Sequence, residues 1–199
     1  MNSREKILEA ISKNKPALQQ LPEIVIDTEY DSSVLMQQFM LTLDSIGATV
    51  FKAENIQTIK DDLQKAIANG AYIVNTIEAL GMVNKEVNIT SDAVFLEPIE
   101  KAYISGTLGV AENGAIWLGE SKIVNRLLPF ICQHLVIVLD ANKIVANMHE
   151  AYRQININKE GYGVFLAGPS KTADIEQSLV IGAHGSRSLK VYILISDNF

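Results

Sequence analysis

The run HLVIVLD at residues 134–140 decides the fold class of this sequence. Its central residues, Leu135 to Leu139, are all apolar, so the run has no polar face for water to solvate. That pattern indicates a strand buried on both faces of a sheet, as in α/β proteins whose helices cover a mostly parallel sheet. The flanking segments should therefore supply those helices.

Upstream of this run, helical and strand patterns alternate. Apolar residues recur at helical spacing in residues 34–48 and 55–70, and a glycine near the end of each segment favours a helix stop. Short apolar runs predict strands at residues 48–53, 71–75 and 92–99. The first hundred residues thus indicate an α/β fold.

Downstream, the same alternation continues to the end of the sequence. Helices are expected at residues 142–155 and 173–182, with strands at 163–167 and 189–195. The central segment 102–121 differs, because strand-like residues flank an Asn-Gly pair that favours a tight turn between two strands. A short helical or irregular element is expected at residues 125–131, between this segment and the central strand.

The N-terminal segment predicts a separate element. Residues 1–30 read as a helix followed by an extended arm, and residues 31–199 read as the α/β domain of a chain with a single globular domain. No apolar run approaches the roughly 18 residues that a membrane span requires. The first residues lack the apolar core of a signal peptide, which favours a cytoplasmic location.

Composition excludes several classes of protein. The net charge is −6 and the pI about 5.1, and no basic cluster is present, so nothing indicates nucleic-acid binding. Cys132 is the only cysteine, and an iron–sulfur cluster takes about four thiolates. The three histidines are widely spaced and form no ligand pair, so a metal site is not expected.

The turn GPSKTAD at residues 168–174 is the first candidate site. If a helix follows it, unpaired N–H groups and Lys171 would suit a phosphate or carboxylate. The segment is no P-loop, because Lys171 and Thr172 stand two positions too late. Alternatively, Ser170 or Thr172 simply caps the helix while Asp174 complements its dipole. The two interpretations have about even weight.

Two further positions attract attention. Glu112 in AENG (111–114) lies at a glycine-bordered turn, where it is either an exposed nucleophile or a solvated hairpin residue. His184 lies in GAHGSRS (182–188), either as a solvated loop residue or as a contact to an anion near Arg187. Cys132 precedes the central strand and reads as a core thiol rather than a nucleophile.

The segments VAENGAIWLGES, NRLLPFICQHLVIVLD, KIV and AGPSKTADIEQSLVIGAHG occur in this order in the LUD-domain family, which this chain resembles from about residue 30 onward. The family includes lactate utilization protein C. Asn113 and Ser186 depart from its usual pattern. The resemblance implies a three-layer α/β/α fold with a mostly parallel sheet, similar to ribose-5-phosphate isomerase, glucosamine-phosphate deaminase and coenzyme A transferases.

The resemblance also marks candidate site residues. We expect their loops to converge at the edge of the sheet where the strands end, with Glu112 facing Lys171 as an acid or base opposite an anion clamp. The marked positions are Glu112, Asn113, Gly114, Arg126, His134, Gly168, Pro169, Ser170, Lys171, Thr172, Asp174, Glu176, His184 and Gly185.

The function implied by the resemblance is that of a non-redox component in the oxidation of L-lactate to pyruvate. Iron–sulfur clusters would then lie only on partner proteins, and this chain would bind a small carboxylate or phosphate without a cofactor of its own. It would have no nucleic-acid partner, and an oligomer is possible. Two alternatives stay open: a coenzyme A transferase-like enzyme with Glu112 as nucleophile, because AENG is similar to the Glu-Asn-Gly signature of those enzymes, and a non-catalytic binding module.

Overall fold

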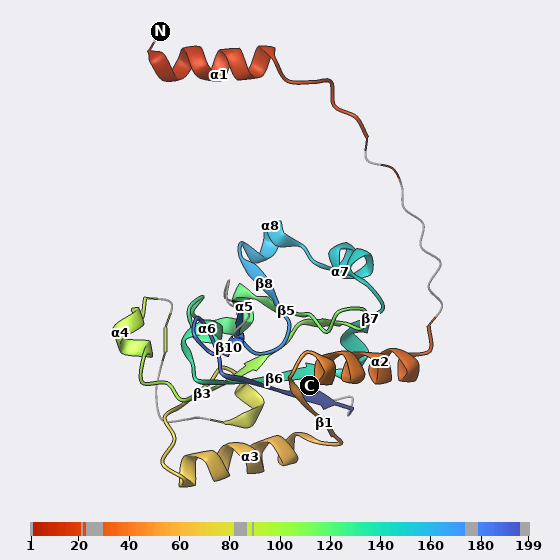
Figure 1. Cartoon of the computed structure of the whole chain (residues 1–199), viewed down its shortest axis with the longest axis vertical. Coiled ribbons are helices and arrows are strands. Elements are labelled where there is room, and N and C mark those ends of the chain that lie inside the picture. Colours follow the sequence, from red (N-terminus) through yellow and green to blue (C-terminus); the bar gives the residue numbers. More distant parts are fainter. Residues whose placement is uncertain are drawn as a thin grey trace.

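The computed structural model describes residues 2–20, 22, 30–81, 87–88, 90–173 and 179–195. Its centre is a sheet of five parallel strands (Figure 1). Across the sheet these are β1 (Thr49–Ala53), β11 (Ser188–Leu194), β6 (His134–Asp140), β3 (Lys101–Ser105) and β2 (Ile73–Asn75). β6 pairs with β11 and β3, and its residues from Leu135 to Leu139 are at most 1% exposed. The prediction of a strand buried on both faces is confirmed.

Helices cover both faces of this sheet. α3 (Ile56–Ala68) packs Ile59 and Leu63 on one face, and α2 (Ser32–Ser45) packs Phe39 and Leu43 on the other. Asn55 caps α3 as expected, because its side-chain oxygen accepts the N–H groups of the first turn. The predicted α/β architecture, with a mostly parallel sheet between helices, is confirmed. The similarity to ribose-5-phosphate isomerase and coenzyme A transferases stays a prediction.

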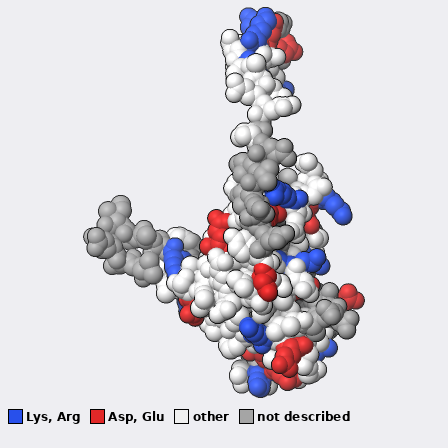
Figure 2. Space-filling view, turned by 90° about the vertical axis from the view of Figure 1, so that its right-hand side faces the viewer, with Lys and Arg blue, Asp and Glu red and all other residues white. Residues whose placement is uncertain are grey.

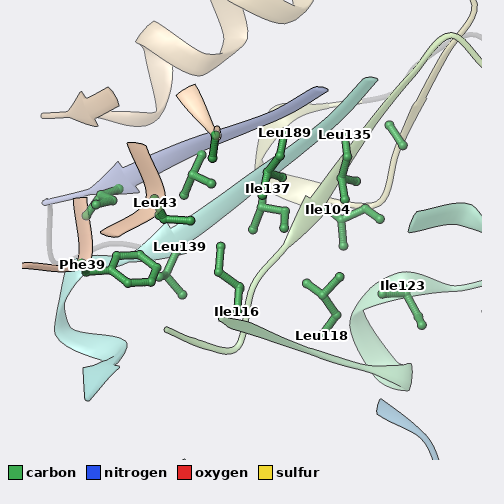
Figure 3. Close-up of a cluster of buried hydrophobic side chains, with 14 of the residues drawn as sticks. Phe39, Leu43, Ile104, Ile116, Leu118, Ile123, Leu135, Ile137, Leu139 and Leu189 are labelled. Atoms are coloured by element: carbon green, nitrogen blue, oxygen red, sulfur yellow. The ribbon is translucent and has the colours of Figure 1, made fainter. Parts of the chain in front are cut away.

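A second, mixed sheet packs over the α2 face. In order across it, the strands are β7 (Ile144–Val145), β4 (Leu108–Val110), β5 (Ile116–Gly119) and β8 (Gly163–Leu166). Ile116 and Leu118 of β5 point toward Ile104, Ile137 and Leu139 of the parallel sheet, where all five side chains are buried (Figure 3). β4 and β5 are antiparallel and joined through the Asn-Gly segment, as the sequence predicts.

An outer layer covers the far side of the second sheet. α7 (Met148–Gln154) and α8 (Ile157–Glu160) lie there in Figure 1, and Trp117 and Ala151 belong to the apolar cluster beneath them. The remaining short helices are η1 (Glu78–Leu80), α4 (Ala93–Leu96), α5 (Glu120–Ile123), α6 (Leu128–Ile131) and η2 (Ala141–Lys143).

Three expected elements differ from the structure. Residues 92–99 do not form a strand: Asp92 accepts the N–H of Phe95 and starts helix α4. Residues 142–155 are not one helix, because Ile144 and Val145 pair with β4 as strand β7 before α7 begins. The spacing of apolar residues did not distinguish helix from strand in either segment. A local hydrogen bond favours the helix at residues 92–99, and pairing with a distant strand favours β7.

The third difference lies in the glycine-rich region. The prediction of one helix over residues 173–182 is wrong, because the described residues of that range lie in β9 (Lys171–Ala173) and β10 (Leu179–Ile181), which pair as antiparallel strands, or at Gly182 just after them. The run Leu179, Val180, Ile181 is rich in aliphatic and β-branched residues, which favour strands. Asp174 and Glu176 lie outside the described residues. The Gly168 turn therefore precedes a strand, and no helix N-terminus is formed at Lys171.

The N-terminal helix is present where the sequence predicts it. α1 (Ser3–Lys13) begins with a capping box, in which Asn2 and Glu5 satisfy each other's backbone N–H groups. α1 buries none of its residues, and Figure 1 shows it away from the sheets. The division into residues 1–30 and 31–199 stays a prediction. Among the described residues, no helix has the length and apolar content to cross a membrane.

Charged groups do not gather into a single patch on the face shown in Figure 2, where acidic and basic side chains are scattered among uncharged ones. The net charge of the whole chain is −6. The expectation that bulk charge does not direct this protein to nucleic acid stays a prediction.

Candidate functional site

The two glycine-rich motifs lie against each other. The N–H of Ser170 donates to the carbonyl of Ser186 at 2.9 Å, and the N–H of Gly182 donates to the carbonyl of Ser170 at 3.0 Å. A Cβ on Gly185 would lie only 3.0 Å from the Cβ of Ser170, so a larger residue would force the motifs apart. The segments at 168–170 and 182–186 thus form one structural unit.

The AENG loop reaches the same region through Ile46, at the end of α2. Cβ atoms placed on Gly114 and Gly168 would each lie 3.0 Å from atoms of Ile46, and both glycines have positive φ. The Nζ atom of Lys171 lies 3.6 Å from the corresponding Cβ position of Gly47, and buried Pro169 packs beside it. Two of the predicted loops therefore converge around the end of α2.

This convergence is at the opposite edge of the sheet from the one expected. Ile46 precedes β1 and Ser186 precedes β11, so the loops gather where the parallel strands begin, here called the amino edge. The expectation of the carboxyl edge was wrong because it took the strand before Gly168 as part of the parallel sheet. That strand, β8, instead belongs to the second sheet and pairs antiparallel with β5.

Glu112 contacts a helix rather than Lys171. Its Oε2 atom accepts the N–H of Met148 at 3.0 Å in the first turn of α7, while its own N–H donates to the carbonyl of Ala146. Asn113 turns back on itself, with its side-chain oxygen accepting the N–H of Ala115. Among the described residues Glu112 and Lys171 form no ion pair.

Arg126 lies apart from these loops. Its Nε atom is 2.6 Å from Oε1 of Glu120, and its guanidinium stacks 4.7 Å from the centre of the Tyr162 ring. The guanidinium of Arg126 is thus paired with Glu120 and Tyr162, and it does not contact the Gly168 turn. Thr172 pairs with Val180 in the small hairpin.

A small pocket opens at the amino edge beside the second glycine motif. It encloses about 250 Å³ and is here called the amino-edge pocket. The backbone N–H of Arg187 donates to the carbonyl of Gln133 at 2.8 Å and ties its two walls together. Among the described residues, the charged or titratable side chains on its exposed rim are His184 and Arg187, and none of those that line it is acidic. The lining residues are Phe130, Ile131, Cys132, Gln133, Gly182, Ala183, His184, Gly185 and Arg187.

His134 reports on the electrostatics of this edge. Its Nδ1 atom is 2.8 Å from Oγ of Ser188. Partial burial lowers the pKa of His134, the positive charges of Lys101 and Arg187 lower it further, and Glu100 opposes them. The local field around His134 therefore disfavours an added cation and suits an anion.

Cys132 lines the amino-edge pocket but is not a reactive thiol. It is 1% exposed, and burial raises its pKa to about 12, so the thiol stays protonated at neutral pH. This confirms the interpretation of a core thiol. In the described part of the chain, no group of three or more His, Cys, Asp or Glu residues is placed to hold a metal ion.

A larger pocket, which the sequence analysis missed, lies at the carboxyl edge. This carboxyl-edge pocket encloses about 730 Å³ where β2, β3 and β6 end. A signal was present in the sequence, because polar residues follow each strand: Thr76 after β2, Ser105 to Thr107 after β3, and Asp140 at the end of β6. Its lining residues are Thr76, Ile77, Glu78, Ala79, Ser105, Gly106, Thr107, Ser121, Lys122, Asp140 and Lys143.

A crystal structure has the same fold. A DUF162 family protein from Deinococcus radiodurans superposes with a TM-score of 0.61, covering 83% of this chain and 99% of that one, at 16% sequence identity. At this identity, the likeness shows the fold alone.

Sequence comparisons identify the family. Residues 99–194 match the LUD domain. Lactate utilization protein C of Anoxybacillus flavithermus is 26% identical over 94% of this chain and 91% of its own length. Lactate utilization protein C of Shouchella clausii is 35% identical over 44% of this chain and 40% of its own. An uncharacterized protein of Neisseria meningitidis is 30% identical over 66% of this chain and 57% of its own.

The matched part thus spans less than two thirds of the Shouchella and Neisseria proteins. The domain match, at residues 99–194, includes the glycine motifs and the central strand. Residues 99–194 of the chain form a LUD domain, and the chain is similar to lactate utilization protein C.

Proposed function

We propose that this chain is a non-redox component of a system that oxidises L-lactate to pyruvate, and that it binds a small carboxylate in the amino-edge pocket. Iron–sulfur proteins would be its partners and would carry the electrons, because Cys132 alone supplies too few thiolates for a cluster. The similarity to lactate utilization protein C supports the pathway, which is proposed for this chain by analogy.

The basic lining of the amino-edge pocket is the observation that supports carboxylate binding. Arg187 offers a planar fork of N–H donors that matches a carboxylate, and His184 lies on the same rim. Because no helix begins at Lys171, the anion would be held by these side chains and by backbone groups of 182–185. A pocket of about 250 Å³ is small enough to suit a three-carbon acid.

Calorimetric titration of the full chain with L-lactate, pyruvate and neutral lactamide tests the ligand. The two acids should bind and lactamide should not. Arg187→Gln should weaken acid binding by about tenfold or more, because a hydrogen bond to a charged group is worth about 1.5–3 kcal/mol. Arg4→Gln on α1 is the matched control. Equal affinities in wild type and Arg187→Gln would overturn the site.

Lys171→Ala tests whether the ligand binds in the amino-edge pocket or beside Lys171 at the end of α2. Lys171 points toward Gly47 and does not line the pocket, so its loss should weaken acid binding less than the loss of Arg187. The reverse order would place the ligand between Lys171 and the end of α2 instead.

The partnership is tested by anaerobic affinity purification of the tagged chain from its native host. Co-purification of iron–sulfur proteins, with lactate-dependent dye reduction in the eluate, is the expected result. A chain that purifies alone and supports no dye reduction when the iron–sulfur fraction is added back would overturn the pathway assignment. A transferase activity with Glu112 as nucleophile gains no support from the geometry, because its carboxylate contacts the N-terminus of α7.

A further inference from the structure

The carboxyl-edge pocket is built from the ends of three neighbouring strands. Open α/β sheets place ligands outside the carboxyl ends of their strands, and this pocket of about 730 Å³ has the size of sites that hold metabolite-sized molecules. It lies at the opposite end of the strands from the amino-edge pocket. A ligand here would therefore be a second one, independent of the proposed carboxylate.

The inner wall of this pocket offers hydroxyl groups. Ser105, at the end of β3, is 7% exposed. The Oγ1 atom of Thr107 is fully buried and has no hydrogen-bond partner among the described residues. Its backbone is fixed, because the N–H of Thr107 donates to the carbonyl of Trp117 at 2.9 Å. A buried hydroxyl without a partner is costly. Thr107 also lines the pocket, so a rotation of its side chain would bring the hydroxyl to a polar group supplied from outside the chain.

Charged groups of both signs surround the rim. Lys122 and Lys143 are exposed, and neither pairs with a carboxylate in the described part of the structure. Thr76 fixes the first of them, since its hydroxyl donates to the carbonyl of Lys122 at 2.8 Å. Asp140 and Glu78 add carboxylates that can accept hydrogen bonds from hydroxyl groups.

A second hollow extends the site. It encloses about 200 Å³ and shares Thr107 and Lys143 with the carboxyl-edge pocket. Trp117 and Ile155 supply apolar surface in this hollow, and Gln154 supplies an amide. The shared residues place an unpartnered hydroxyl and an unpaired cation where the two hollows meet, so an extended ligand fits better than a compact ion.

We infer that the carboxyl-edge pocket binds an anionic metabolite with several hydroxyl groups. The acidic group of the ligand pairs with Lys122 or Lys143, and its hydroxyl groups bond to Thr107, Ser105 and Asp140. Carboxylate and phosphate share this chemistry, because lysine binds both as a point charge.

Calorimetric titration of the full chain tests this site with four probes. D-gluconate and sorbitol 6-phosphate carry the two acidic groups on a polyol, while sorbitol and acetate each lack one half of that chemistry. At least one polyol anion should bind about tenfold or more tightly than sorbitol or acetate, through charge-assisted hydrogen bonds. The polyol anion that binds more tightly shows whether the pocket prefers a carboxylate or a phosphate. Polyol anions that bind no more tightly than sorbitol would overturn the inference.

Thr107→Val gives the sharper test, because valine has the shape of threonine without the hydroxyl. The variant should lose affinity for the polyol anion while its melting temperature stays equal or rises, since an unpartnered hydroxyl is removed. Lys143→Met should also weaken binding, and Lys65→Met on the opposite face of the sheet should not. Unchanged affinity in Thr107→Val would overturn the assignment of that residue and of the site.

The inference and the proposed lactate function fail separately. Arg187→Gln should leave the affinity for the polyol anion unchanged, and Thr107→Val should leave the affinity for L-lactate unchanged. If Arg187→Gln removed both affinities while the protein stayed folded by circular dichroism, one site would account for both ligands and the second site would be refuted.

Discussion

The two faces of the parallel sheet are packed by different chemistry. On the face toward α2 and β5, the contacts are apolar, with Phe39, Ile137 and Leu139 completely buried (Figure 3). On the face toward α3, Asp62 lies among the apolar residues and accepts a hydrogen bond from the Tyr103 hydroxyl at 2.8 Å. Apolar packing supplies much of the stability but is non-directional, whereas hydrogen bonds to a carboxylate fix the position of a helix.

Lys190 completes the polar contacts on the α3 face. Its Nζ atom is 3.0 Å from Oδ1 of Asp62 and lies over the rings of Phe51 and Tyr192, at 5.6 and 5.7 Å. Burial alone would raise the pKa of Asp62, but hydrogen bonds from Lys190 and Tyr103 outweigh it and hold this pKa below its usual value. The ion pair and the tyrosine thus depend on one carboxylate.

The largest effect should come from the apolar face. Ile137→Ala removes a completely buried side chain and should lower the free energy of unfolding by about 2–5 kcal/mol, measured by denaturant titration. Val94→Ala is the control, because Val94 is 78% exposed on α4 and its truncation should change stability by less than about 0.5 kcal/mol. A loss below about 1 kcal/mol at residue 137 would mean that this face is not the main source of stability.

A smaller effect is expected on the polar face. Asp62→Ala leaves the Tyr103 hydroxyl and Lys190 without their partner, and should cost about 1–2 kcal/mol because the ion pair is partly solvated. The neighbouring Asp61 is exposed and accepts a hydrogen bond from the side chain of Gln57, so Asp61→Ala should cost less than about 0.5 kcal/mol. Equal losses at both positions would show that the hydrogen bonds of Asp62 to Tyr103 and Lys190 do not hold α3 in place.

The pH dependence of stability should give the smallest effect. The lowered pKa of Asp62 contributes stability above its unfolded pKa of about 3.9, and this contribution is lost as pH falls through the folded value. Melting temperatures between about pH 2 and 5 should therefore fall less steeply with acid in Asp62→Asn than in wild type.

Tyr192 provides the matching test in base. Burial, followed by the charge of Asp62, raises its pKa to about 12. Its contribution is complete below the unfolded pKa of about 10 and is lost as pH rises toward the folded value. Tyr192→Phe should reduce the loss of stability between about pH 10 and 12, and identical curves would contradict this account.

The helices on both faces could be predicted because their signals are local. Leu35, Phe39 and Leu43 stand at helical spacing and are buried together on α2. Asn55 caps α3 by accepting the N–H groups of Gln57 and Thr58, as its position before the helix suggests. The central strand had an equally local signal in its unbroken apolar run.

The second sheet could not be predicted in full because distant partners decide it. Ile144 and Val145 fit a helical pattern, yet they pair with Gly109 and Val110 of β4. The same holds for Leu179–Ile181, whose partner is the segment Lys171–Ala173. A short apolar run does not distinguish helix from strand until a neighbouring strand supplies its hydrogen bonds.

The positions of the candidate sites also depend on contacts between residues that are distant in the sequence. The loops at Gly114 and Gly168 both lie against Ile46 at the end of α2, but the pairing of β8 with β5 in the second sheet, which no local pattern encodes, places them at the amino edge. The carboxyl-edge pocket joins Thr76, Ser105 and Asp140 from three strands. Only the strand order β2, β3, β6 makes these residues neighbours, and no local pattern encodes that order.

The position of Trp117 on β5 makes the second sheet optically distinct. It is the only tryptophan in the chain, and its ring is 4.8 Å from that of Phe165 on β8. The absence of a side chain on Gly163 leaves room for this ring, because a Cβ there would overlap it. Tryptophan emission therefore reports on the second sheet alone, while far-ultraviolet circular dichroism records both sheets and the helices. Comparing the two signals during melting reveals directly whether the layers unfold as one cooperative unit.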